Sequence, residues 1–540
     1  MGNLVYRRPP IVEDVYLSED RGAWALKRPP GWVDLGLVAI LPALAALGLS
    51  LVGIGFGLPF LFRPDEDVMI GRAVHMVGEG SWDPLFYNYP PLAFYLMGLA
   101  ESILRLVPGQ HLGSATTVNP AAEYLSGRLA SAAMFVASVV FTTLTALRLN
   151  RSRLAAVVAG MVLALSPIAV REAHFATVDM IQCAAVAITF WSASGAKRPR
   201  QMVLAGLACG AAAATKYTGG LALIPVLILA WGIQPRGRSM LAAIAGTVVG
   251  FAVPFLPVLG KLGDYANGLG FLLGRSQGTY GGDSIGFVFH PTVSIPYGLG
   301  LGAYALAIIG IAVAVRFRTR GDIAVLAYLA AVLVLLGPSH EVFFRYILPA
   351  LPALALLAAG TVRIIPVRGW RRGLATSAIG LLLLPSLYAG VAGDLLLART
   401  DTRDLAAQWM DANLPPGTSV GILSYWGQPY YGPAELPTNP LHPLYVTGDN
   451  VADSFQQGLY TTRFQILPSD QACYIVYESG PPQAGPVPHP RGQVVATFRP
   501  FVGALPQGAV YDSIDSFYLP LWGFSDLARP GPAIVIVKAC

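Results

Sequence analysis

The sequence predicts an α-helical polytopic membrane protein with a smaller α/β domain at its C-terminal end. Of the 540 residues, 54% are hydrophobic and only 12% are charged. The apolar residues gather in blocks of roughly 17 to 25, which is the length of helix that crosses a bilayer core. After residue 392 these blocks stop, and shorter strand-like runs replace them.

The first 32 residues are polar and carry Arg7, Arg8, Lys27 and Arg28. They do not have the short apolar core and small-residue cleavage site of a signal peptide. Basic residues beside a first span favour the cytoplasmic side. We therefore expect residues 1–32 to form a cytoplasmic N-terminal arm.

Twelve apolar blocks follow, at 33–57, 90–107, 124–147, 153–170, 175–195, 201–215, 218–233, 239–259, 294–315, 322–337, 345–362 and 373–392. The second block decides the topology, because counting it as a span would move every later loop to the other side. The loops at 148–153, 196–200, 234–238, 316–322 and 363–372 hold fifteen Lys and Arg residues and one acid, Asp322. Such loops face the cytoplasm. We therefore expect about eleven spans, with 90–107 lying along the outer surface as a juxtamembrane helix.

This topology divides the chain into a transmembrane domain over 33–392, with a first outer loop at 58–123, and an extracytoplasmic domain over 393–540. The stretch "DTRDLAAQWMDANLPPGTSVGILSYW" has the pattern of a helix, a turn and a strand, and "AIVIVKAC" is a strand-like run. For Cys473 and Cys540 two interpretations stay open, a disulfide in this compartment or two free thiols.

Ionisable residues gather in the segments that face outward. Because charged groups are costly at the hydrocarbon boundary, a set drawn from several segments indicates a functional site. Carboxylates can accept a proton from a nucleophile, and Arg and Lys can hold a phosphate. The set comprises Asp65, Glu66, Asp67, His75, Asp83, Tyr89, Arg171, Glu172, His174, Asp179, Lys216, Tyr217, Arg275, Asp283, His290, His340, Glu341 and Arg345.

A sugar carried on a lipid phosphate needs both kinds of group, and its tail stays in the bilayer. Neither a P-loop nor a strand-linked dinucleotide fingerprint competes with this interpretation. The basic residues lie in short clusters between apolar blocks, which argues against nucleic acid as a partner.

Several motifs occur in a characteristic order: an Asp-Glu pair early in the first outer loop, then "YPPL", "REAHFATVD", "TKYTG" and "RYILPALP". Over residues 33–392 the chain resembles the GT-C glycosyltransferases related to protein O-mannosyltransferases and to the aminoarabinose transferases of lipid A. The resemblance implies a GT-C like transmembrane domain, a catalytic base at Asp65 with Glu66 beside it, and binding of the carrier phosphate at Lys216. It implies no role for residues 393–540.

We therefore expect a glycosyltransferase of the plasma (inner) membrane, in contact with membrane lipids. It would move a hexosyl or pentosyl group, with inversion, from a polyprenyl-phosphate donor to an acceptor on the outer face. The acceptor, which is a protein, a lipid or a glycan, stays open, as does the sugar. The expected catalytic residues are Asp65 and Glu66, and the expected substrate-binding residues are Lys216, Tyr217, Arg345, Asp179, Arg171, His174 and Tyr89.

Other interpretations stay open. Asp65 also suits a helix N-cap, Lys216 a side chain that snorkels to the headgroups, and Arg345 an interfacial anchor. The motifs imply no cofactor, although His174 and Glu172 with His75 or Asp83 offer ligands for a divalent metal. The alternative functions are a lipid or glycan transporter or flippase, which the absence of an internal repeat disfavours, and an inactive accessory subunit.

Overall fold

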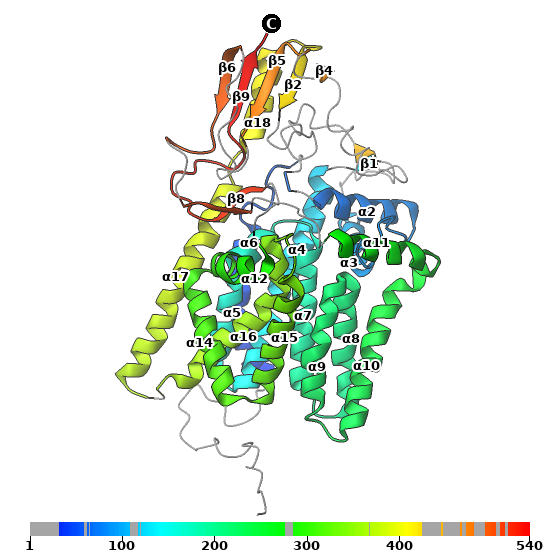
Figure 1. Ribbon diagram of the computed structural model, residues 1–540, viewed down its shortest axis with the longest axis vertical. Helices are drawn as coiled ribbons and strands as arrows, with labels where there is room; N and C mark the ends of the chain where they lie inside the picture. The colour runs from blue at the N-terminus through cyan, green and yellow to red at the C-terminus, as the bar shows by residue number, and fades with distance from the viewer. Residues whose placement is uncertain are drawn as a thin grey trace, which may run out of the picture.

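The computed structural model describes residues 32–58, 62–63, 65–107, 117–118, 120–275, 284–366, 368–423, 444–445, 465–466, 471–479, 492–503, 508–512 and 517–540. Within them, a tall helical bundle carries a small β domain at one end (Figure 1). The predicted N-terminal arm lies outside the described residues, apart from Trp32.

Apolar helices build the bundle, and each of the eleven blocks predicted to span contains one of them. Four stretches in the described part of the chain are long and apolar enough to cross a membrane, and six if each of two bent helix pairs counts as one span. The helices are α1 (Trp32–Leu51), α4 (Pro120–Asn150), α5 (Arg153–Ala164), α7 (Val178–Gly195), α8 (Pro199–Thr215), α9 (Leu223–Ala230), α10 (Arg236–Ala252), α14 (Leu301–Phe317), α15 (Arg320–Leu336), α16 (Leu351–Gly360) and α17 (Trp370–Leu397).

Short helices gather at the end of the bundle that carries the β domain (Figure 1), namely α2 (Glu66–Glu79), α3 (Leu92–Leu104), α6 (Pro167–Ala173), α11 (Leu262–Arg275) and α12 (Gly286–Phe289). Helix α3 lies in the 90–107 block, for which we predict a juxtamembrane position: it buries Phe94 and Met97 and exposes Leu99 and Ile103. The remaining helical segments are η1 (Tyr217–Ala222), η2 (Val253–Lys261), η3 (His290–Ser294), α13 (Ile295–Leu299), η4 (Phe344–Ala350) and η5 (Thr361–Ile364).

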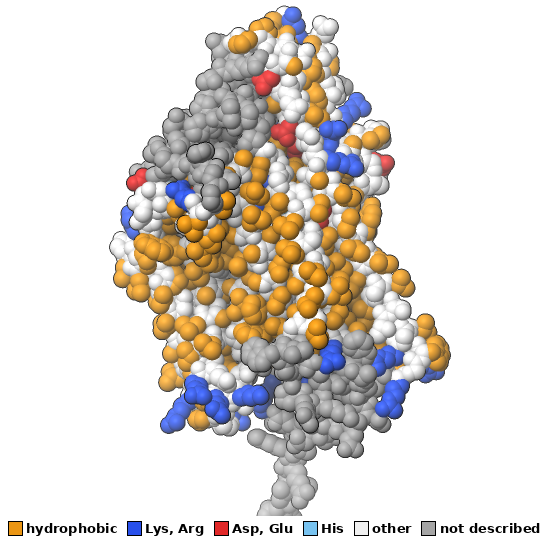
Figure 2. All heavy atoms as spheres, turned by 180° about the vertical axis from the view of Figure 1, so that it is seen from behind, with side chains coloured by type: hydrophobic (Ala, Val, Ile, Leu, Met, Phe, Trp, Pro, Cys, Tyr) orange, Lys and Arg blue, Asp and Glu red, His pale blue; other side chains and the backbone are white. Residues whose placement is uncertain are grey.

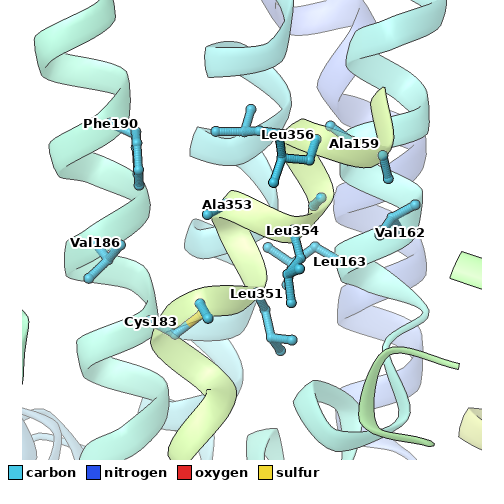
Figure 3. Close-up of a cluster of buried hydrophobic side chains, with 14 of the residues drawn as sticks. Ala159, Val162, Leu163, Cys183, Val186, Phe190, Leu351, Ala353, Leu354 and Leu356 are labelled. Carbon is cyan, nitrogen blue, oxygen red and sulfur yellow. The ribbon is translucent and has the colours of Figure 1, made fainter. Parts of the chain in front are cut away.

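Helix α16 forms the centre of the bundle. Its sequence "LPALALLAAG" is apolar on every face, and all ten of its residues are buried, as expected for a helix with neighbours all around it. Figure 3 shows Leu351 and Leu354 of α16 between Leu163 of α5 and Cys183 of α7. Because η4 leads directly into α16, this packing also fixes the position of η4 along the axis of the bundle.

Helices α8 and α10 pack backbone against backbone. A Cβ atom on Gly206 or Gly210 of α8 would collide with the carbonyl oxygens of Ala243 or Thr247 in α10, and Gly246 and Gly250 of α10 are equally close to α8. Both helices therefore use two glycines four residues apart to approach closely, a pattern common where helices pack in membranes.

The basic loops lie at the end of the bundle away from the β domain. Figure 2 shows Lys and Arg side chains at that end, below a broad hydrophobic band. Asp322, the one acid of these loops, receives hydrogen bonds from Arg363, including one of 2.8 Å from Nη1. Arg363 also donates to Asn150 Oδ1 at 2.9 Å. The acid thus pairs with a loop cation and ties α15 to α4.

The β domain contains α18 (Thr402–Asn413) and a five-stranded mixed sheet. The sheet order is β4-β2-β5-β9-β6, with β2 parallel to β4 and β5, and β9 antiparallel to β5 and β6. Met410 of α18 packs on Val476 and Ile536, and a disulfide joins Cys473 to Cys540. The strands are β2 (Ser419–Leu423), β4 (Gln465–Ile466), β5 (Tyr474–Glu478), β6 (Gln493–Phe498) and β9 (Ile534–Lys538).

Two further strand pairs join the β domain to the bundle. The antiparallel pair β7 (Val510–Asp512) and β8 (Phe517–Trp522) lies against α17. Strand β1 (Thr117–Val118), in the first outer loop, pairs antiparallel with β3 (Leu444–Tyr445). Segments far apart in the sequence therefore meet between the helix ends and the β domain.

Candidate active site

The start of α2 holds Asp65 in a left-handed backbone conformation. Its φ is 72° and its ψ is −11°, a region in which Asp is more often found than most residues other than Gly. Its side chain makes no cap hydrogen bond to α2. Instead, Asp65 Oδ2 lies 2.7 Å from Arg345 Nη2, and the Asp65 side chain is 45% exposed. The Asp65 side chain is therefore half-exposed and paired with Arg345, and it does not cap the helix.

Arg345 approaches Asp65 from the interior of the protein. It lies in η4, its side chain is 9% exposed, and its guanidinium carbon is 5.0 Å from the centre of the Phe343 ring. An interfacial anchor reaches outward to the headgroups, whereas Arg345 is buried beside the first outer loop. Arg345 is therefore placed to contact a negatively charged group that enters next to Asp65.

Lys216 and Asp179 form a second ion pair at the junction of α7, α8 and η1. Lys216 Nζ lies 2.8 Å from Asp179 Oδ1, and the side chains are 15% and 3% exposed. Burial opposes the charge on Lys216, but the adjacent Asp179 carboxylate outweighs it and raises the pKa of Lys216 above its usual value. One turn further along α7, Gln182 donates to Thr218 Oγ1 at 2.7 Å. Two side chains of α7 thus hold η1, and Lys216 stays charged.

The phenol of Tyr89 lies close enough to both ion pairs to be influenced by their charges. Lys216 Nζ is 5.5 Å from the centre of the Tyr89 ring and 5.0 Å from that of Tyr346. Burial raises the pKa of Tyr89, and its hydroxyl also senses the charges of Lys216, Asp65, Arg345 and Asp179. These contacts bring five of the predicted site residues together around one phenol: Asp65, Tyr89, Asp179, Lys216 and Arg345.

Glu66 is adjacent to Asp65 in the sequence but has different surroundings. Its side chain is completely buried. Arg128 Nε and Nη2 donate to Glu66 Oε1 and Oε2 at 2.9 and 2.8 Å, and the backbone N–H of Ala176 donates to Oε1 at 2.9 Å. A carboxylate with both oxygens in such a two-pronged pair has little capacity left for a substrate. This arrangement supports a structural role for Glu66, joining α2 to α4.

Arg171 and Glu172 of α6 belong to a buried polar chain. Glu172 accepts from Arg63 at 2.9 Å and from Arg171 Nε at 2.9 Å, and Arg171 Nη2 lies 3.8 Å from Asp512 Oδ2 of β7. His174 is buried as well, with its ring nitrogens 2.8 Å from the carbonyl oxygens of Val170 and Val52. These partners of Arg171 and His174 lie outside the five residues grouped around Tyr89.

Tyr217 and the predicted metal ligands Asp83 and His75 have other neighbours. Tyr217 interacts electrostatically with Tyr265 of α11. Asp83 accepts hydrogen bonds from the Tyr87 hydroxyl at 3.1 Å, and the neighbours of His75 include Glu79 and Arg72. Among the residues that the structure describes, no three His, Cys, Asp or Glu side chains converge in a way that could hold a metal ion.

Sequence reasoning missed Arg128, Tyr346 and Asp512. Tyr346 directly follows Arg345, so its place beside a predicted site residue in the motif could have indicated it. Arg128 lies in an ordinary span pattern, and Asp512 lies 168 residues from Phe344, whose backbone N–H donates to it. Neither carries a local signal, since only the tertiary structure supplies their partners.

The helical bundle has the GT-C fold of multi-pass membrane proteins, as its similarity to a solved structure shows. The chain is 19% identical to apo ArnT of Cupriavidus metallidurans, with a TM-score of 0.50 over 72% of this chain and 82% of that one. The sequence profile of the dolichyl-phosphate-mannose-protein mannosyltransferases matches residues 84–234. The predicted resemblance to GT-C glycosyltransferases related to protein O-mannosyltransferases is therefore confirmed.

Two further solved structures are similar at a lower score. ArnT of Cupriavidus metallidurans bound to undecaprenyl phosphate is 20% identical, with a TM-score of 0.48 over 70% of this chain and 73% of that one. The oligosaccharyltransferase AglB of Archaeoglobus fulgidus, in complex with an inhibitory peptide and a dolichol-phosphate, is 14% identical, with a TM-score of 0.48 over 82% and 69%. No curated protein matches the chain significantly by sequence.

Proposed function

We propose that this protein transfers a sugar from a polyprenyl-phosphate donor to an acceptor hydroxyl on the extracytoplasmic face of the plasma (inner) membrane. The observation that carries the proposal is the half-exposed Asp65 carboxylate, which is 2.7 Å from the buried Arg345 and belongs to the same charged group as Lys216. A base, two cations and an adjoining bilayer are what transfer from a lipid phosphate requires.

In the proposed reaction, the phosphate of the donor binds between Arg345 and Lys216, which screen its charge. The acceptor oxygen then forms a bond to the anomeric carbon, and the bond from that carbon to the phosphate oxygen breaks. Asp65 takes the proton of the acceptor hydroxyl, and polyprenyl phosphate leaves with the electron pair. Attack opposite the leaving group inverts the anomeric configuration.

The Arg345–Asp65 pair gives this reaction an order. Without donor, Arg345 holds the carboxylate that is to act as the base. An incoming phosphate competes for the same guanidinium, and the carboxylate is then free to face the acceptor. We infer that the donor binds before the acceptor, because the base becomes available only when Arg345 has another anion to bind.

The proposed topology has about eleven spans with the N-terminus in the cytoplasm. The basic loops at one end of the bundle support a cytoplasmic side there. The Cys473–Cys540 disulfide supports an oxidising compartment for the domain at the other end. In this orientation the charged group around Tyr89 faces outward, beside the β domain.

The test is transfer by purified protein supplied with a panel of polyprenyl-phosphate sugars, scored by released polyprenyl phosphate. Asp65→Asn should lower transfer at least about 100-fold while the melting temperature is preserved, since it removes the base. Asp264→Asn, at a carboxylate of α11 that is 48% exposed, is the matched control and should keep full activity. An Asp65→Asn variant as active as the wild type would overturn the proposed role of Asp65.

A further inference from the structure

Asp65 and Arg345 form the proposed catalytic pair. A continuous chain of buried polar contacts also links these two residues through a strand of the C-terminal domain. It starts at Arg63, two residues before Asp65, and runs to Glu172 at 2.9 Å. Glu172 binds Arg171 at 2.8 Å, and Arg171 lies 3.8 Å from Asp512 Oδ2. The same Asp512 oxygen accepts the backbone N–H of Phe344 at 3.0 Å, and Phe344 immediately precedes Arg345.

The direct contact between Arg345 and Asp65 closes this chain into a ring. Apart from Asp65, the members of the ring are all buried. Between Arg63 and Asp512 the ring contains two cations and two carboxylates, so their charges balance. In a buried network of this kind, the loss of one member leaves the others without full compensation.

The strand that supplies Asp512 is firmly attached to the bundle. Leu519 of β8 packs in one buried cluster with Phe62, Phe175 and Leu396. The guanidinium carbon of Arg403 lies 3.8 Å from the centre of the Phe62 ring and 5.5 Å from that of Tyr518. The β7–β8 pair is therefore fixed between the first outer loop and α17, and Asp512 is held with it.

We propose that Asp512 is a positioning residue, through which the C-terminal domain sets the geometry of the Asp65–Arg345 pair. The N–H groups in the first turn of a helix have no acceptor within that helix, and Asp512 supplies the acceptor for Phe344. By fixing this N–H, it sets where η4 begins and where Arg345 can reach. The catalytic meaning of this role rests on the proposed sugar transfer, whereas the structural link does not.

The test compares Asp512→Ala with Asp512→Asn in the full-length protein. The amide oxygen of Asn can still accept from Phe344, whereas Ala removes the acceptor. We expect Asp512→Ala to speed deuterium exchange at the Phe344 amide and to lower kcat about 10- to 100-fold, the scale of an error of about 1 Å in positioning. Asp512→Asn should keep most of the wild-type protection of the Phe344 amide and most of the wild-type kcat.

Thr402→Val is the matched control. It removes another buried hydrogen bond of the β domain, the 2.7 Å contact from Thr402 Oγ1 to the Pro532 carbonyl, which includes no member of the ring. We expect a lower melting temperature with unchanged kcat and unchanged exchange at Phe344. If Asp512 contributes to stability alone, Asp512→Ala should also lower the melting temperature without changing kcat or exchange at Phe344. That outcome would overturn the proposal.

Double variants test whether Asp512 acts through Arg345. Arg345→Lys keeps a cation but loses the reach that η4 sets, so adding Asp512→Ala to it should change kcat by less than about 2-fold, as expected for coupled residues. If Asp512→Ala lowers kcat by the same factor in the wild type and in Arg345→Lys, the proposal is overturned. If the wild type accepts no polyprenyl-phosphate sugar, the proposed reaction is wrong, and deuterium exchange at Phe344 still decides whether Asp512 holds η4.

Discussion

At the residue scale, adjacent carboxylates differ because the backbone turns between them. Asp65 has a positive φ, and Glu66 is the first helical residue of α2. That turn directs the Asp65 side chain to the charged residues around Tyr89. It directs the Glu66 side chain into the protein, where Arg128 binds it. A pair that looks like one motif in the sequence therefore separates into a half-exposed carboxylate and a fully buried, paired one.

Glu66→Gln should be a stability variant. Replacing a buried carboxylate leaves Arg128 without its counter-charge, which costs about 3–5 kcal/mol of unfolding free energy. Denaturant unfolding in detergent should show this loss, while the folded fraction should retain its kcat. Folded and inactive Glu66→Gln protein would instead indicate that Glu66 takes part in the chemistry.

The Lys216–Asp179 pair allows a similar separation of roles. Lys216→Met alone should weaken donor binding and also lower stability, because it leaves the buried Asp179 carboxylate unpaired. Lys216→Met with Asp179→Asn removes both charges, so it should recover stability without recovering donor binding. Thermal unfolding with and without added undecaprenyl phosphate measures both quantities. Recovery of the lipid-induced shift in the double variant would rule out a direct role of Lys216 in phosphate binding.

At the element scale, close backbone packing holds the helices that carry the site. Helix α8 ends immediately before Lys216. The position of α8 along its axis, relative to α10 and α7, therefore sets the position of that lysine. The glycines at the α8–α10 contact make this approach as close as the backbone permits. Movement of α8 along its axis would therefore be transmitted directly to the Lys216–Asp179 pair.

Gly206→Ala should lower the unfolding free energy by about 1–3 kcal/mol, because the added methyl meets the α10 backbone and forces the helices apart. Gly380→Ala in α17 is the control: its Cβ would meet nothing within 4 Å, and we expect an unchanged or slightly higher melting temperature. Equal melting temperatures for the two variants would contradict the close contact between α8 and α10.

At the scale of the whole molecule, three layers follow one another along the long axis: basic helix ends, a hydrophobic band and the β domain (Figures 1 and 2). The β domain is tied to itself by the Cys473–Cys540 disulfide across a separation of 67 residues. It is tied to the bundle through β7 and β8. The site thus lies where the bundle and the β domain meet.

The orientation can be tested with single cysteines and a membrane-impermeant maleimide. In sealed right-side-out vesicles, Ser525→Cys in the β domain should be labelled at once, and Arg371→Cys in a basic loop only after permeabilisation. Both positions are exposed, and the remaining free cysteines, Cys183 and Cys209, are buried. Labelling of Arg371→Cys in intact vesicles would reverse the proposed topology.

The disulfide makes a separate prediction. Cys473→Ser should destabilise the β domain by about 3–5 kcal/mol, because the unfolded chain regains the freedom of a long loop. Protease sensitivity of this domain, compared with and without a reductant, measures the effect. The wild type should become as sensitive as Cys473→Ser only after reduction, whereas equal sensitivity without reductant would argue against the bond.

The sequence by itself determined the class of fold, the positions of the apolar blocks and the charge asymmetry of the loops, because bilayer thickness and the cost of charge in lipid act on local composition. It also singled out the motif residues that meet at Tyr89. Only the tertiary structure decided that the Asp65 carboxylate is half-exposed and that the Glu66 carboxylate is buried against Arg128. The separation of Asp65 from Glu66 and the link from Asp512 to Arg345 depend on partners that are distant in the chain, and a local pattern carries no information about them.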